Sequence, residues 1–78
     1  MGQTETLPKG WRVELLGIIN GVQFEHTDGF RKLLWCDGEW SMISGRFSVP
    51  ARHMPRAKNQ TEARKVGTHA LNHWGGDE

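Results

Sequence analysis

The stretch LLWCDGEW, residues 33–40, decides the fold because it places an Asp-Gly pair between two runs of strand-forming residues. Asp37 and Gly38 favour a two-residue hairpin turn, in which both central residues adopt positive φ angles. Counting outwards from this turn predicts three cross-strand pairs: Trp35 with Trp40, Cys36 with Glu39, and Leu33 with Met42. Direct pairing of the two tryptophans contributes roughly 0.2–1 kcal/mol beyond their burial.

Asn20 and Gly21 carry the same turn signal earlier in the chain. As a two-residue turn they pair Ile19 with Val22, Gly17 with Phe24, and Leu15 with His26. The two hairpins together predict strands within residues 11–19, 22–28, 30–36 and 39–44.

The pattern changes after residue 44. Pro50 and Pro55 exclude a central strand, so residues 45–60 are predicted to be a basic irregular arm in which Phe47 and Val49 form at most a short edge strand. A helix over residues 61–74 follows, with small or apolar residues at helical spacing: Ala63, Val66, Gly67, Ala70 and Trp74. Thr61 is the expected N-cap and Gly75-Gly76 the stop. Gly67 costs about 1 kcal/mol relative to alanine in a helix, which indicates close approach to the sheet.

These elements predict an α+β fold, with an antiparallel sheet of three to five strands covered by one C-terminal helix. We expect one domain over residues 9–76, a flexible N-terminal tail over 1–8 and a C-terminal tail over 75–78. One face of the sheet is expected to meet the helix: Val13, Leu15, Ile19, Val22, Phe24, Leu33, Trp35, Trp40 and Met42. A candidate apolar interface lies on the opposite face: Leu16, Ile18, Leu34 and Ile43. The arm, a protein partner or a second copy in a homodimer would cover that face, unless these residues are ordinary exposed side chains.

Length and composition exclude several classes of protein. The 78 residues contain no run of about 20 apolar residues that could span a membrane, and the first ten residues lack the layout of a signal peptide. Cys36 is the single cysteine, so no internal disulfide can form. A cytoplasmic protein without membrane contact is therefore expected.

The side chains that could carry chemistry are dispersed. The metal-ligand candidates are His26, His53, His69, His73 and Cys36. His69 and His73 fall on the flank of the predicted helix and no CxxC motif accompanies them, so no metal site is expected. Cys36 has Glu39 opposite, and an acidic neighbour disfavours the reactive thiolate form of a cysteine. The carboxylates Glu14, Glu25, Asp28 and Glu39 are assigned to polar strand positions. We therefore expect neither enzymatic activity nor a cofactor.

Positive charge is concentrated in one segment. Residues 45–65 hold six cations against Glu62 alone, whereas residues 1–44 hold four against six acidic residues. The six are the candidate macromolecule-binding residues: Arg46, Arg52, Arg56, Lys58, Arg64 and Lys65. Such groups bind phosphates or acidic protein surfaces.

Two short stretches resemble known families. LPKGW, residues 7–11, resembles the start of a WW domain, but the chain has no tyrosine and no proline that closely follows the second tryptophan of that pattern, so no peptide-binding residues carry over. The hairpins followed by a helix that begins TEARKV, residues 61–66, are similar in layout to small accessory proteins of bacteriophages, including anti-CRISPR inhibitors. That resemblance implies a protein without catalytic residues that covers a surface of a host protein.

The expected function is that of a small non-enzymatic binding protein, an inhibitor or adaptor of a nucleic-acid-handling protein or nucleoprotein. The alternative is direct binding of DNA or RNA phosphates through residues 46–65.

Overall fold

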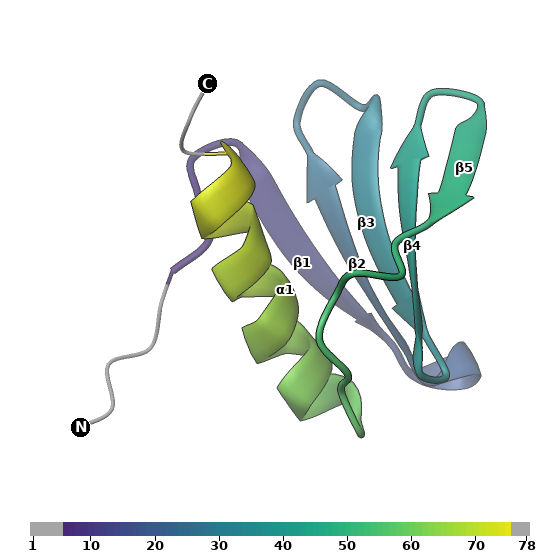
Figure 1. Ribbon diagram of the computed structural model, residues 1–78. Coiled ribbons are helices and arrows are strands. Elements are labelled where there is room, and N and C mark those ends of the chain that lie inside the picture. Colours follow the sequence, from purple (N-terminus) through teal and green to yellow (C-terminus); the bar gives the residue numbers. More distant parts are fainter. Residues whose placement is uncertain (1–5, 76–78) are drawn as a thin grey trace.

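The computed structural model describes residues 6–75. They form five strands and a C-terminal helix: β1 (Trp11–Leu16), β2 (Gly21–His26), β3 (Arg31–Cys36), β4 (Glu39–Ser44), β5 (Phe47–Pro50) and α1 (Gln60–Gly75). The strands make one antiparallel sheet in the order β1-β2-β3-β4-β5, and α1 lies across one face (Figure 1). The predicted α+β class is confirmed. The parts of the predicted tails within residues 1–5 and 76–78, and the side chain of Trp74, lie outside the described residues.

The turn between β3 and β4 has the predicted form. Asp37 and Gly38 have φ angles of 49° and 94°, the positive values that a two-residue turn of this type requires. Trp35 lies opposite Trp40, and the two neighbouring pairs are also as predicted. Both tryptophans are buried.

The turn between β1 and β2 differs from the prediction. Val22 pairs with Leu15 instead of Ile19, and residues Gly17–Ile19 form a short 3-10 helix between the strands. Asn20 has a φ of 50°, but Gly21 already belongs to β2. A Cβ at Gly21 would lie 3.0 Å from the Trp35 carbonyl oxygen. Gly21 therefore allows close contact between β2 and β3 and is not a central residue of the turn.

The register shift moves pairing by an even number of residues and therefore leaves the faces of the sheet unchanged. Val13 faces Phe24 across the β1–β2 ladder, on the side where Val22 and Phe24 are buried. Ile19, which was assigned to that face, lies in the 3-10 helix and is exposed. The predicted strand over residues 11–19 thus ends at Leu16.

Helix α1 begins one residue before the predicted start, and Asn59 replaces Thr61 as its cap. Asn59 Oδ1 accepts a hydrogen bond from the Glu62 backbone N–H at 2.9 Å. In return, Glu62 Oε1 accepts the Lys58 backbone N–H at 2.9 Å. The two bonds resemble a capping box, except that the glutamate accepts the N–H of the residue before the cap.

Close approach of α1 to the sheet depends on Gly67. A Cβ at this position would overlap two ring atoms of Phe24, Cε1 and Cζ. Phe24, on β2, is fully buried. The prediction that Gly67 permits helix–sheet contact is confirmed.

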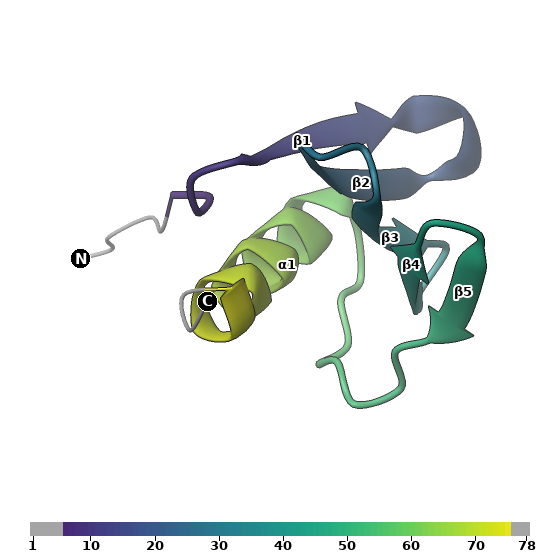
Figure 2. The same cartoon turned by 90° about the horizontal axis from the view of Figure 1, so that it is seen from above.

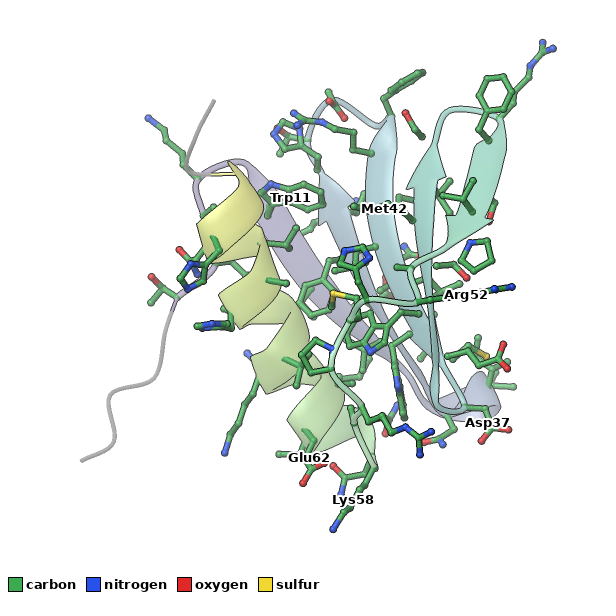
Figure 3. The ribbon with its side chains drawn as sticks, in the orientation of Figure 1. Trp11, Asp37, Met42, Arg52, Lys58 and Glu62 are labelled. Carbon is green, nitrogen blue, oxygen red and sulfur yellow. The ribbon has the colours of Figure 1, made fainter. Side chains whose placement is uncertain are left out.

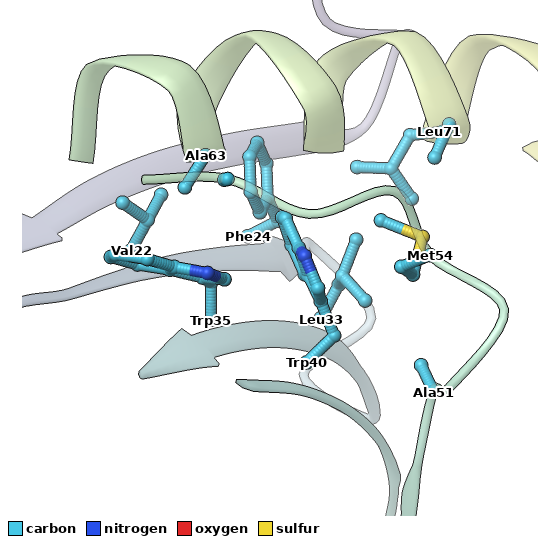
Figure 4. Packing of buried hydrophobic residues seen from close by; sticks show 11 residues of the cluster. Val22, Phe24, Leu33, Trp35, Trp40, Ala51, Met54, Ala63 and Leu71 are labelled. Atoms are coloured by element: carbon cyan, nitrogen blue, oxygen red, sulfur yellow. The ribbon is translucent and has the colours of Figure 1, made fainter. Parts of the chain in front are cut away.

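The segment between β5 and α1, residues 51–59, we call the connector. It runs on the same side of the sheet as α1 (Figure 2). The core lies between these two segments and the sheet (Figure 4): Val22, Phe24, Leu33, Trp35, Trp40, Ala51, Met54, Ala57, Ala63, Ala70 and Leu71. Within residues 6–75, no helix is long and apolar enough to cross a membrane.

Candidate functional site

The six cations of the candidate macromolecule-binding set are all exposed, but they occupy three separate elements. Arg46 lies in the turn between β4 and β5, and Arg64 and Lys65 lie in the first half of α1. The remaining three, Arg52, Arg56 and Lys58, belong to the connector. Figure 3 places Arg52 beside the end of β5 and Lys58 next to Glu62 at the start of α1.

The connector is anchored to the core, whereas the sequence predicts only a basic irregular arm over residues 45–60. Three of its side chains, at a spacing of three residues, are buried in the core: Ala51, Met54 and Ala57. The Trp40 indole Nε1–H donates a hydrogen bond to the Pro55 carbonyl oxygen at 3.2 Å. The Ala51 backbone N–H donates to the Trp40 carbonyl oxygen at 2.9 Å. The connector cations therefore extend from a segment with a defined path.

Arg52 and Arg56 are brought to the same place. Both line a hollow of about 360 Å³ that opens between the β3–β4 turn and the connector. Its remaining lining residues are Gly38, Glu39, Trp40, Pro50, Ala51 and Met54. The two guanidinium groups and the single carboxylate, that of Glu39, give the lining of the hollow a net positive charge. This charge attracts carboxylate or phosphate oxygen atoms.

The six cations of residues 46–65 differ from Arg12 and Arg31 in whether they form ion pairs. Arg12 forms an ion pair with Glu25 at 2.9 Å, and Arg31 forms one with Asp28 at 3.1 Å. Across the described part of the chain, none of the six cations has an ion-pair partner. Their charges are consequently not neutralised within that part of the molecule.

The four residues of the candidate apolar interface do not form one continuous surface. Leu16, Leu34 and Ile43 are half-buried, whereas Ile18 lies in the 3-10 helix and is 100% exposed. Leu34 pairs with Ser41 and Ile43 with Lys32, so polar residues separate the apolar ones on that face. The connector does not cover this face, because it lies on the helix side (Figure 2).

A polar cluster at the β2–β3 turn was not foreseen from the sequence. Asp28 Oδ1 accepts backbone N–H bonds from Phe30 at 2.8 Å and from Arg31 at 3.2 Å. The bond from the Phe30 N–H is the main reason why the pKa of Asp28 falls to about 2. The Asp28 backbone N–H donates to His26 Nδ1 at 3.0 Å, and Trp11 packs edge-on against the His26 ring with centroids 5.1 Å apart. A carboxylate held by so many donors closes a turn and is unsuited to act as a general base.

Asp28 thus lies in the turn between β2 and β3, whereas the sequence pattern predicts a polar strand position for it. The signal that could have revealed it is the Asp-Gly pair within HTDGFR, residues 26–31, because aspartate commonly bonds backbone N–H groups two or three residues ahead in turns.

The metal-ligand and nucleophile candidates do not converge. Among residues 6–75, no group of three or more histidine, cysteine, aspartate or glutamate side chains could hold a metal ion. The rings of His69 and His73 do lie close, with centroids 4.2 Å apart. The half-buried thiol of Cys36 lies 3.6 Å from the Ile19 carbonyl oxygen, opposite Glu39 in the β3–β4 ladder.

Comparison of the chain with protein-family models, curated proteins and solved structures gives no significant match.

Proposed function

We propose that this protein is a small non-enzymatic binding protein that covers a surface of a macromolecular partner, and that the partner is a protein that handles nucleic acid. The proposal rests on one observation above all. Arg52 and Arg56 are exposed, lack ion-pair partners among the described residues and line the same hollow.

The anchoring of the connector supports this function. Because Met54 is buried on the sheet, and the indole N–H of Trp40 bonds to Pro55, the backbone that carries the two arginines is ordered before the partner binds. Preorganisation lowers the entropy cost of association. An acidic surface, such as one that mimics nucleic-acid phosphates, is the complementary partner.

The experiment is recovery of a complex from nuclease-treated cell lysate with tagged protein. We expect a nucleic-acid-handling protein to be captured, and the Arg52→Glu, Arg56→Glu double variant to lose it. Lys9→Glu is the control, because Lys9 is also exposed but lies outside the connector. Capture that persists in the double variant contradicts the assignment of the connector as the contact surface.

Direct binding of DNA or RNA is the second candidate function. It is favoured by the exposure of all six cations, since guanidinium and ammonium groups that are free of internal partners bind phosphates. Both core tryptophans are buried, which argues against base stacking on the sheet. Binding to generic duplex DNA that weakens steeply with rising salt is the expected result for this function. No detectable binding at low salt would exclude it.

A further inference from the structure

Strand β5 is a free edge of the sheet. It is the last strand in the sheet order and pairs with β4 alone. In both ribbon views no described segment lies alongside its outer side (Figures 1 and 2). All four of its residues are exposed. An exposed edge of this kind presents backbone groups that another extended chain can pair with.

The ladder register identifies these outward groups. The Ala51 N–H bonds to the Trp40 carbonyl oxygen, and Ser41 lies opposite Pro50. Because hydrogen-bonding direction alternates along a strand, Val49 and Phe47 direct their backbone groups towards β4, whereas Ser48 and Pro50 direct theirs outwards. Proline has no N–H, so the donor on this edge is the Ser48 N–H, and the Ser48 and Pro50 carbonyl oxygens are acceptors.

Apolar side chains accompany this edge. Phe47 and Val49 alternate with Ser48 and project on the side of the sheet that carries Met42. They are 76% and 56% exposed. An added strand would therefore cover apolar surface that β4 and the helix leave open.

Charge identifies the chemistry of that strand. Arg46 precedes β5 and Arg52 follows it, and both are exposed. No aspartate or glutamate occurs between Glu39 and Glu62. A second copy of β5 would bring like charges together at these positions, whereas an acidic segment would be attracted to them.

We propose that the free edge of β5 binds an extended acidic peptide segment of the protein partner, which adds as a further strand. This inference rests on the proposed function, because it takes the partner to be a protein. The segment exchanges backbone hydrogen bonds with Ser48, places apolar side chains on Phe47 and Val49, and places carboxylates near Arg46 and Arg52.

The test uses a displayed library of random peptides about ten residues long, a typical upper length for a strand, selected on the full chain. Ser48→Pro removes the outward donor without breaking a bond to β4, and Ser48→Ala is the matched control that keeps this donor. Circular dichroism and thermal unfolding establish that the variants fold. Arg46→Glu with Arg52→Glu provides a second variant in which the backbone edge is intact and only the charge is reversed.

We expect selected peptides to be rich in aspartate and glutamate, to bind Ser48→Ala as they bind the wild type, and to lose about tenfold or more in affinity for Ser48→Pro. The double arginine variant is expected to lose binding similarly. Peptides that bind Ser48→Pro undiminished, or the absence of any enrichment on the wild type, would overturn the proposal. Binding of an oligothymidylate in place of acidic peptides would also overturn it and favour direct nucleic-acid binding.

The lysate experiment separates this inference from the proposed function. A partner that is retained by Ser48→Pro but lost by the Arg52→Glu, Arg56→Glu variant would leave the proposed function intact and contradict strand addition. Loss of the partner by Ser48→Pro, together with its retention by Ser48→Ala, supports both the proposed function and strand addition.

Discussion

The inner face of the sheet is covered in two different ways. Over Phe24, a regular helix approaches so closely that Gly67 cannot carry a side chain without overlap. Over Trp40, the connector contributes three small or flexible side chains and one hydrogen bond from the indole to Pro55. The first region is held by continuous helical hydrogen bonds and tight packing, and the second by isolated anchors.

This difference indicates that stability is unevenly distributed. Segments with few buried contacts open at lower free energy than the elements that pack at the centre of a core. The connector carries Arg52 and Arg56, so the proposed contact residues belong to the less strongly held region. The following predictions test that contrast, and the largest expected effect comes first.

Truncation of one buried side chain in each region should have unequal effects. Phe24→Ala is expected to cost about 3–5 kcal/mol, because the helix and sheet cannot collapse into the space that the ring leaves. Met54→Ala is expected to cost about 2 kcal/mol, because the connector can relax. Urea denaturation measures both losses. Equal losses would contradict the difference between the two regions.

Addition of a methyl group at Gly67 tests the tight contact directly. Gly67→Ala gains about 1 kcal/mol of helix propensity but overpacks Phe24 at a cost of about 1–3 kcal/mol, so a net loss of about 0–2 kcal/mol is expected. In a Phe24→Leu background the overlap is removed, and the same substitution should be neutral or stabilising. A double-mutant cycle on the free energy of unfolding reports the coupling. Additive effects would show that the contact does not limit helix position.

Trp35 and Trp40 are cross-strand neighbours, and together they allow a matched test of the hydrogen bond that holds the connector. The Trp40 indole N–H bonds to Pro55, whereas the buried Trp35 indole nitrogen has no hydrogen-bond partner among the described residues. Trp40→Phe should therefore cost about 1 kcal/mol more than Trp35→Phe, since it leaves the Pro55 carbonyl oxygen without its donor. Chemical denaturation of the two variants gives the comparison, and a larger loss for Trp35→Phe would contradict it.

The smallest effect concerns the turn that joins β2 to β3. Because the pKa of Asp28 is lower in the folded protein than its ordinary value of 3.8, its carboxylate favours folding above that pH, and the contribution is lost as the pH falls through about 2. The melting temperature of the wild type should therefore drop more between about pH 4 and about pH 2 than that of Asp28→Asn. Identical pH profiles would show that the turn does not depend on the charge of Asp28.

The two turn signals show what the sequence could and could not predict. Around Asp37-Gly38, local geometry and cross-strand pairing of tryptophans agree, so the register follows by counting. Around Asn20-Gly21, the local preference for a tight turn competes with close packing of Gly21 on the Trp35 carbonyl, and the packing determines the outcome. Gly21 and Trp35 are far apart in the sequence, so a pattern of neighbouring residues does not predict this competition.

The candidate site was predictable in composition but not in arrangement. The six cations follow from counting charges, and their exposure follows from their chemistry. The anchoring of the connector did not follow, because Pro50 and Pro55 interrupt any regular pattern, and the buried set contains two alanines, which indicate burial only weakly. The hollow that unites Arg52 and Arg56 depends on that anchoring.

The order of the strands in the sheet is also their order in the chain, and this has a consequence for synthesis. Each strand can pair with the one that emerged from the ribosome just before it, so no strand must wait for a distant partner. Sheets built from such neighbouring pairings close short loops and assemble quickly. Helix α1, which packs on β2, is the element that must return over a long stretch of chain, and we expect its docking to complete the protein after the five-stranded sheet has formed.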